Sequence, residues 1–247
     1  MAGELVLLPN LLSEKSNPKE QLPENLGAIF STLDGLIVEN AKSARRFIVR
    51  FSRDLLQLPM ETLNEHTQNL KGLLSPMKKG EKWGLLSEAG LTCIADPGAK
   101  LVELVRKQGI SVRALPGPSS IFMGLMLSGF SGQSFTFHGY LPRRRPLLDQ
   151  RLEVLVRRSQ KEGTTQIFIE APYRNNQLFA TLLELLPNDA NLCVACDLTD
   201  PNEWVETLSV SLWKKRKAPD LHKRPTLFLF NSILDKNFAK GSKANQN

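Results

Sequence analysis

Two glycine-containing turns hold the residues best suited to binding a ligand. The first glycine turn, Ser87 to Gly98 (SEAGLTCIADPG), follows the apolar run Trp83 to Leu86 and precedes a helix-forming segment. The second glycine turn, Leu115 to Ser120 (LPGPSS), follows another short apolar run in the same way. In open α/β sheets, such turns lie at the carboxyl ends of the strands, where ligands bind. Either turn alone could be a plain connection, but two successive turns predict one shared crevice.

The two turns offer mainly backbone groups and small side chains to a ligand. Gly90 and Gly98 permit a close approach of the backbone. In the second turn, two prolines stiffen the loop around Gly117, and Ser119 and Ser120 provide donors at a helix N-terminus.

Several common catalytic motifs do not occur in the sequence. Neither turn matches G-x-G-x-x-G or G-x-x-x-x-G-K-[ST], which argues against dinucleotides and nucleoside triphosphates as ligands. There is no G-x-S-x-G elbow. Because His66, His138 and His222 are scattered without a paired nucleophile, we expect a structural or surface role for each.

Short strands alternate with helices along the chain, and these elements must position the two turns. The expected strands are Leu5–Leu8, Gly35–Val38, a short strand and loop at Glu61–His66, Trp83–Leu86, Val112–Leu115, Ser134–Tyr140, Gln166–Glu170, Leu192–Cys196 and Thr226–Phe230. The expected helices are a segment around Leu26–Leu33, then Ser43–Phe51 capped by Ser43, Gln68–Met77, Ala99–Gln108, Ile121–Leu127, Leu147–Gln160 and Asn176–Leu186. This alternation predicts an α/β fold with mixed, largely parallel sheets covered by helices.

The length of 247 residues suggests two domains, at roughly 150 residues per domain. We expect an N-terminal α/β domain over residues 1–116 and a C-terminal α/β domain over residues 117–234. After about Leu234 the composition turns to Lys, Asn, Gly and Ser, which predicts a disordered basic tail over residues 235–247.

The composition is that of a globular protein with a basic surface. Hydrophobic residues make up 41% and charged residues 23% of the chain, which argues against wholesale disorder. The net charge of +7 attracts polyanions and would assist binding to nucleic acid. The sequence has neither a long apolar run nor the pattern of a signal peptide, so we expect a cytoplasmic protein.

The three cysteines are expected to be reduced. Cys193 and Cys196 form a C-x-x-C, but no second pair of ligands completes a zinc site, and the motif lies in an apolar strand pattern. With Cys93 the count is odd, which argues against a disulfide framework. We predict no metal site.

The order of the motifs resembles the tetrapyrrole methylase superfamily of S-adenosylmethionine-dependent methyltransferases. The chain is most similar to the branch that 2′-O-methylates a ribose of small-subunit ribosomal RNA. The motifs that carry this resemblance are the two glycine turns, V-E-N-A-K-S-A-R-R (Val38–Arg46), N-E-H (Asn64–His66), F-x-G-Y-L-P (Phe137–Pro142), E-A-P-Y-R (Glu170–Arg174) and A-C-D-L-T (Ala195–Thr199).

The resemblance implies two α/β domains with S-adenosylmethionine in the cleft between them, gripped mainly by backbone atoms, and a homodimer. It also implies which residues of this chain would contact the cofactor. These are Pro9 after the first strand, Gly90, Leu91 and Ile94 in the first glycine turn, Ser119 and Ser120 in the second, and Glu170, Cys196, Leu198 and Thr226 in the second domain.

The chain departs from this branch at two places. The loop after the first strand usually contains glycine, whereas this chain has Pro9 to Glu14 (PNLLSE) and no glycine until Gly27. Where the family tends to show Arg-Glu-Leu-Thr-Lys, this chain has Cys196 to Asp200 (CDLTD), so two basic positions are lost. The first departure affects the side of the site that would receive the methyl group, and the second weakens the expected contacts with phosphate.

Methyl transfer to an alcohol requires alignment of the acceptor with the methyl group and removal of a proton. Glu88, Asp96, Asp197 and Arg174 are the candidate helpers, and the sequence does not rank them. Glu88 and Asp96 could equally be acids that cap helices.

Two groups of basic side chains could hold an RNA backbone, because the planar fork of arginine suits phosphate. The alternative is a solvated basic surface. The residues are Arg143, Arg144 and Arg145 in one group, and Lys42, Arg45 and Arg46 in the other.

Three functions are therefore open. The first is methyl transfer to RNA, at a ribose 2′-hydroxyl of ribosomal RNA. The second is methyl transfer to a small molecule such as a tetrapyrrole. The third, motivated by the two departures, is a catalytically degenerate relative that only binds RNA.

Overall fold

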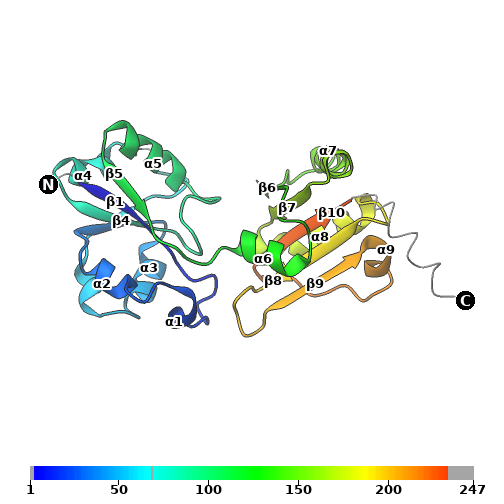
Figure 1. The fold of residues 1–247 in the computed structure, drawn as a ribbon, viewed down its shortest axis with the longest axis horizontal. Coiled ribbons are helices and arrows are strands. Elements are labelled where there is room, and N and C mark those ends of the chain that lie inside the picture. The colour runs from blue at the N-terminus through cyan, green and yellow to red at the C-terminus, as the bar shows by residue number, and fades with distance from the viewer. Residues whose placement is uncertain (1–2, 68, 233–247) are drawn as a thin grey trace, which may run out of the picture. The chain divides into compact units, whose positions relative to one another are not determined.

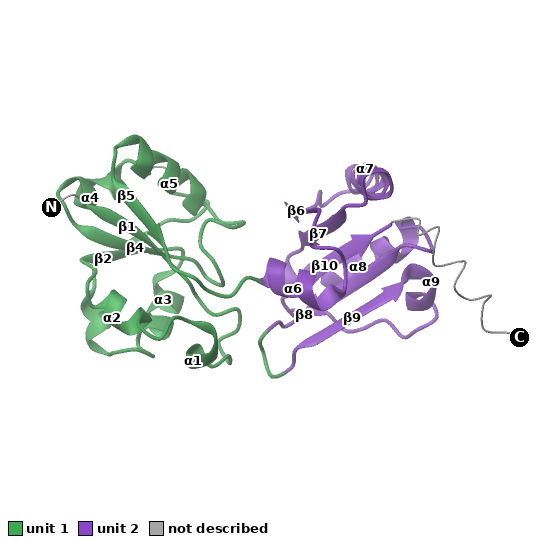
Figure 2. Ribbon diagram, viewed as in Figure 1, with its two compact units in different colours: residues 1–119, 199–201 green, residues 120–198, 202–247 purple. Residues whose placement is uncertain are grey.

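The computed structural model describes residues 3–67 and 69–232 of the chain. It divides into two compact units (Figure 2): unit 1 contains residues 1–119 and 199–201, and unit 2 contains residues 120–198 and 202–247. Each unit has its own five-stranded sheet. The predicted tail, residues 235–247, lies outside the described residues.

Unit 1 is built on a parallel sheet with the strand order β3-β2-β4-β1-β5 (Figure 1). The three inner strands, β1, β2 and β4, are short and mainly apolar, and in β2 all four residues are buried. Such runs are typical of strands covered on both faces. The strands are β1 (Glu4–Leu8), β2 (Gly35–Val38), β3 (Met60–Thr62), β4 (Lys82–Leu86) and β5 (Ser111–Ala114).

Helices cover both faces of this sheet, because successive side chains of a strand point to opposite faces. On one face, strand side chains such as Val6 and Leu36 pack with α2 (Leu26–Phe30) and α3 (Ala41–Ile48). On the other face, Leu5 and its neighbours pack with α5 (Gly98–Lys107).

The strand connections of unit 1 are of the kind that leaves room for a ligand at the carboxyl edge of the sheet. Strands β1 and β4 are neighbours, but the chain leaves them toward opposite faces. After β1 it continues through α1 (Pro18–Gln21) to α2, and after β4 it continues to α5. Where neighbouring strands diverge in this way, a parallel sheet has room for a ligand.

Unit 2 is built on a mixed sheet with the strand order β6-β7-β10-β8-β9. Only β6 and β7 are parallel; the other pairs are antiparallel. The strands are β6 (Phe135–Tyr140), β7 (Thr165–Ile169), β8 (Asn191–Cys196), β9 (Trp204–Ser209) and β10 (Thr226–Asn231).

Helices also cover both faces of the unit 2 sheet. One face packs Phe168, Phe228 and Phe230 against α7 (Leu147–Glu162), α8 (Asn175–Leu185) and α9 (Val210–Trp213). On the other face, α6 (Ser120–Ser128) lies close to the sheet, since a methyl group on Gly124 would come within 2.4 Å of Leu227. The predicted α/β fold class is confirmed, with one parallel and one mixed sheet.

Several predicted elements differ from the structure. The helix expected at Gln68–Met77 is wrong. Its described part forms the 3₁₀ turn Gly72–Leu74 and the short helix α4 (Ser75–Lys78), because Pro76 lacks the N–H that a longer helix needs. Helix α3 begins at Ala41 rather than Ser43, since the Asn40 side chain accepts hydrogen bonds from the Lys42 and Ser43 amides. Three short elements were not expected: α1, β9 and α9.

Two further 3₁₀ turns complete the structure, at Asp54–Gln57 and Pro172–Arg174. Within the described residues, no helix is both long and apolar enough to cross a membrane.

Candidate functional site

Three loops of unit 1 meet at the carboxyl edge of its sheet. Gly117, after β5, lies so close to Pro9, after β1, that a methyl group on Gly117 would be 2.2 Å from Pro9 Cβ. The same methyl group would be 3.4 Å from the Leu91 side chain, after β4. The structure therefore brings together the two glycine turns and the first-strand loop, residues 9–17, as the shared-crevice prediction requires.

Asn10 joins the first-strand loop to the first glycine turn. Its Nδ2 atom donates to the carbonyl oxygens of Ser87 (2.8 Å) and Glu88 (3.0 Å), and its main-chain N–H donates to Gly90 O (2.8 Å). The Asn10 side chain is only 8% exposed, so water cannot easily replace these bonds. Asn10 was not among the predicted site residues.

The first glycine turn has an unusual backbone. Gly90, Cys93 and Ala95 all have positive φ angles, between 61° and 68°, and the last two are not glycines. The Asp96 side chain stabilises the turn by accepting hydrogen bonds from the amides of Cys93 and Gly98, both at 2.7 Å. Strained backbone of this kind tends to be found where a ligand must be contacted.

Asp96 has a structural task. Burial raises its pKa, and the two amide hydrogen bonds oppose that rise. Because each carboxylate oxygen already accepts one of these bonds, the side chain holds the turn in shape.

Glu88 points toward α3. Its Oε1 atom accepts a hydrogen bond from Ser43 Oγ at 2.5 Å, and its main-chain N–H donates to Glu39 Oε1 at 3.1 Å. Burial raises the pKa of Glu39. Unlike Asp96, Glu88 has a carboxylate oxygen that accepts no hydrogen bond within the described chain, and this oxygen could accept a proton from a substrate.

In unit 2, three of the predicted residues lie at one edge of the sheet. Glu170 follows the end of β7, Cys196 ends β8, and Thr226 begins the antiparallel strand β10 between them. The Thr226 hydroxyl donates to Cys196 Sγ (3.4 Å) and to Arg224 O (3.0 Å). Glu170 Oε1 accepts from the Ala171 amide (2.7 Å), and Leu198 is buried just beyond β8.

The remaining predicted residues are more accessible. Ile94 is 49% exposed at the tip of the first glycine turn. Ser119 and Ser120 are half-buried and lie on either side of the division between the two units.

Asp197 and Arg174, two of the candidate helpers, belong to unit 2. Asp197 is held by Arg224, whose Nε atom donates to its carboxylate at 2.7 Å. Arg174 forms a buried ion pair with Glu170, with 3.5 Å between Nε and Oε2. The Arg174 Nε atom and the Oδ1 atom of Asn175 are buried without a hydrogen bond in the described chain.

The altered segment 196–200 has contacts of its own. Residues 199–201 count with unit 1, where Asp200 accepts a hydrogen bond from Ser13 Oγ at 2.6 Å and lies 3.7 Å from Lys15 Nζ. Ser16 Oγ donates to Thr199 O at 2.9 Å. The altered first-strand loop and the altered residues 199–200 are thus in direct contact. No residue of the first-strand loop has a positive φ.

The two groups of basic side chains that could hold RNA differ in how far carboxylates of the chain already bind them. Arg145 donates to both Asp149 (2.7 Å) and Glu184 (2.9 Å), so its guanidinium is held on unit 2 by carboxylates. Lys42, Arg45 and Arg46 are exposed on α3 of unit 1.

The three cysteines are free, and the described residues contain no cluster of His, Cys, Asp and Glu side chains suited to a metal ion. Burial raises the pKa of both Cys93 and Cys193 to about 11, and the charge of Asp96 adds to the rise at Cys93. Since only the thiolate reacts with alkylating agents, these thiols should be slow to react.

We expect iodoacetamide at about pH 8 to alkylate Cys93 and Cys193 at least about 100-fold more slowly in the native protein than in the urea-unfolded chain. The pKa is higher in the folded state, so raising the pH increases the native rate until the thiols ionise. Peptide mass spectrometry over time gives both rates. Equal rates for Cys93 in the folded and unfolded chain would contradict the burial argument.

Similar proteins point to one family. A sequence model of the family described as "Tetrapyrrole (Corrin/Porphyrin) Methylases" matches residues 34–211. Several relatives carry the name "Ribosomal RNA small subunit methyltransferase I". The Thermotoga maritima protein is 33% identical over 164 residues, which are 64% of this chain and 70% of that protein. The Vibrio cholerae protein is 28% identical over 184 residues, which are 74% of this chain and 62% of that protein.

A solved structure supports the fold. The uroporphyrin-III-C-methyltransferase of Thermus thermophilus superposes with a TM-score of 0.55 at 17% identity, over 94% of this chain and 93% of that one. At this identity the similarity concerns the fold alone.

Proposed function

Because the chain belongs to the tetrapyrrole (corrin/porphyrin) methylase family and is therefore a methyltransferase, we propose that it transfers a methyl group from S-adenosylmethionine to a ribose 2′-hydroxyl of ribosomal RNA. The family membership confirms the resemblance carried by the sequence motifs. RNA as the acceptor is supported by the names of the relatives and by the net charge of +7.

The observation that carries this proposal is the meeting of three loops at the carboxyl edge of the unit 1 sheet. Members of this family use S-adenosylmethionine, a molecule with hydrogen-bonding groups along its whole length. The loops fit such a ligand, because the first glycine turn has positive φ angles at Gly90, Cys93 and Ala95, a backbone shape that tends to occur at ligand sites.

The proposed contacts with the cofactor are the ten residues expected from the family resemblance. In unit 1 they are Pro9, Gly90, Leu91, Ile94 and Ser119. In unit 2 they are Ser120, Glu170, Cys196, Leu198 and Thr226.

The bound cofactor supplies an activated methyl group on its sulfonium. The chain must hold the acceptor oxygen in line with that group and accept the proton that the hydroxyl loses. In unit 1, Glu88 is better suited to accept the proton than Asp96, since both oxygens of Asp96 are already engaged by amides.

The test is transfer of labelled methyl from S-adenosylmethionine to small ribosomal subunits taken from cells that lack this protein. Label in a ribonuclease-sensitive fraction, mapped to one 2′-O-methylated nucleotide, is the expected result. Label in a ribonuclease-resistant small-molecule fraction would identify a different acceptor. RNA binding without transfer, and without a calorimetric signal for the cofactor, would identify a degenerate relative.

We also propose that the protein is a cytoplasmic homodimer, as the family resemblance suggests. Sedimentation equilibrium at micromolar concentration measures the oligomeric state. A constant monomer mass of 27.6 kDa across the concentration range would rule the dimer out.

A further inference from the structure

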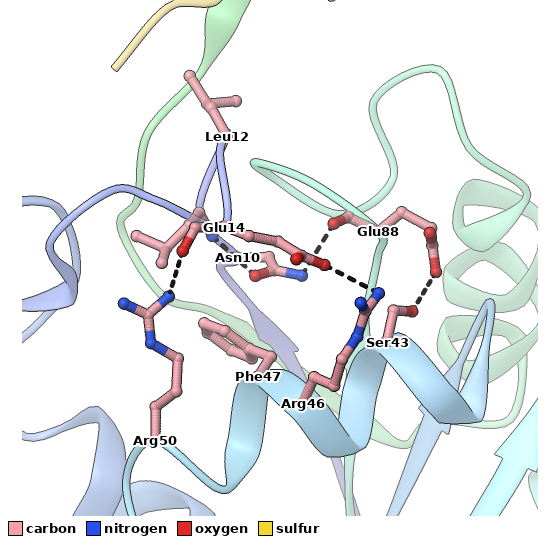
Figure 3. A pocket seen from close by; sticks show the side chains of 9 residues that line it. Asn10, Leu12, Glu14, Ser43, Arg46, Phe47, Arg50 and Glu88 are labelled. Carbon is pink, nitrogen blue, oxygen red and sulfur yellow. Dashed lines mark hydrogen bonds and ion pairs between the residues drawn. The ribbon is translucent and has the colours of Figure 1, made fainter. Parts of the chain in front are cut away.

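A cavity of about 210 Å³ lies in unit 1 between the first-strand loop and α3. Figure 3 shows Arg46 on α3 and Arg50 just after its end, both extending toward the loop, and Glu88 reaching Ser43. The residues that line it are Asn10, Leu11, Leu12, Glu14, Ser43, Arg46, Phe47, Arg50 and Glu88.

The guanidinium of Arg46 lies at the cavity and forms an ion pair with Glu14 that another anion could displace. Its Nη2 atom lies 2.9 Å from Glu14 Oε1, but the two side chains are 58% and 74% exposed. Ion pairs exposed to this degree contribute little stability. An anion with two oxygens could therefore replace Glu14, because the arginine fork binds such groups through two parallel hydrogen bonds.

Arg50 also lines the cavity, but its guanidinium binds the backbone of the first-strand loop. It donates to two main-chain carbonyls of the first-strand loop, Glu14 O (3.1 Å) and Ser16 O (3.0 Å). These bonds fix the loop over α3 and leave the positive charge of Arg50 beside the cavity. The loop is therefore preorganised around the position where an anion would bind.

The other side of the cavity suits a neutral hydroxyl group. The Ser43 hydroxyl donates to one oxygen of Glu88, and the second Glu88 oxygen accepts no bond within the described chain. Leu12 and Phe47 add apolar side chains to the lining. A ribose phosphate combines the three features that this cavity suits: an anionic phosphate, a sugar hydroxyl and a small apolar ring face.

Size and charge agree with this ligand class. The volume is below the roughly 300–1,000 Å³ of pockets for drug-sized ligands, so it accommodates one sugar phosphate and not a macrocycle. The segment AKSARRFI of α3 has three basic residues and no acidic residue. Its field attracts a polyanion such as RNA.

The cavity also adjoins the loops proposed to bind the cofactor. Asn10 and Glu88 line the cavity, and the Asn10 side chain donates to the Glu88 carbonyl while its N–H donates to Gly90 O. A ligand in the cavity thus shares its wall with the first glycine turn.

We propose that this cavity binds one ribose-phosphate unit of the RNA acceptor, with Arg46 on the phosphate and Glu88 accepting a hydrogen bond from a sugar hydroxyl. The inference rests on the proposed function and adds the place and the residues that hold the acceptor. It accounts for the altered first-strand loop, which forms one wall.

The test compares Arg46→Ala with the control Arg53→Ala. Both residues are exposed arginines of unit 1, but only Arg46 lines the cavity. With small ribosomal subunits as acceptor, Arg46→Ala should raise KM at least about tenfold, as expected for a charge-assisted hydrogen bond. Arg53→Ala should change KM by less than about threefold, and both variants should bind S-adenosylmethionine like the unmodified protein.

A small probe isolates the cavity from the rest of the RNA. In saturation-transfer NMR, ribose 5-phosphate should bind the unmodified protein and Arg53→Ala, while its signal should be lost with Arg46→Ala. Ribose without phosphate should bind more weakly, and Arg46→Lys should restore part of the signal because it keeps the charge without the fork.

The outcomes separate the two proposals. If the unmodified protein methylates RNA but Arg46→Ala and Arg53→Ala have the same KM, the cavity proposal is overturned and the proposed function stands. If the unmodified protein transfers no methyl group to RNA, the proposed function fails, and the assignment of the cavity to an RNA acceptor fails with it.

Discussion

Gly117→Ala is expected to remove most of the affinity of this protein for S-adenosylmethionine. The added methyl group would lie 2.2 Å from Pro9 Cβ and 3.4 Å from the Leu91 side chain, so it would push apart the three loops that meet at this point. Pro9 is buried and its ring is rigid, so the backbone has to move. Overpacking of this kind costs about 1–3 kcal/mol.

The displacement should reduce catalysis more than stability. A shift of about 1 Å in groups that align reactants can lower a rate by about 100-fold. We therefore expect about 100-fold slower methyl transfer and at least a tenfold higher calorimetric Kd for S-adenosylmethionine, in a protein that still unfolds cooperatively.

Gly27→Ala is the matched control in the same unit. A methyl group there would lie 3.5 Å from Phe51, an ordinary contact, and Gly27 is inside α2. Alanine should stabilise the helix by up to about 1 kcal/mol and leave cofactor binding unchanged. Normal cofactor affinity in Gly117→Ala would show that the meeting of the three loops does not form the cofactor site.

Much of the fold could be predicted from the sequence, because its signals are local. Continuous apolar runs such as Leu5–Leu8 and Gly35–Val38 indicate buried parallel strands, and both form the unit 1 sheet. The strand β9 (WVETLS) was missed because all six of its residues are only half-buried and polar and apolar types are mixed. Its place at the edge of the sheet removes the pattern on which prediction depends.

The candidate site was predictable only in part. The glycine turns could be found because each follows a strand directly. The residues that join the loops could not, since their partners are distant in the sequence: Asn10 binds carbonyls 77 and 78 residues away. Likewise, the contact between Gly117 and Pro9 depends on β1 and β5 being neighbours in the sheet.

Asn10→Asp is expected to destabilise the protein more than Asn10→Ala at neutral pH, and both should weaken cofactor binding. The Asn10 side chain donates two hydrogen bonds, to Ser87 O and Glu88 O, and accepts one at 2.8 Å from the Leu11 amide. Alanine leaves the two carbonyls without these donors, at a cost of about 1–3 kcal/mol for each buried group. A carboxylate adds repulsion, because it would face the same two oxygens with a negative charge.

The pH dependence distinguishes lost hydrogen bonds from this repulsion. In Asn10→Asp, the facing carbonyls should raise the pKa of the introduced carboxyl above its unfolded value of about 3.9. The stability of this variant relative to Asn10→Ala should therefore be greatest below about pH 4 and decrease as the pH rises through the folded-state pKa. Urea unfolding between about pH 3.5 and pH 7 measures the difference.

Asn40→Asp is the control, since Asn40 only accepts amide hydrogen bonds at the start of α3 and a carboxylate accepts them equally well. If Asn10→Asp were as stable as Asn40→Asp at neutral pH, Asn10 would not be the tie between the two loops, and the shape of the site would have to come from the packing of Pro9, Leu91 and Gly117 alone.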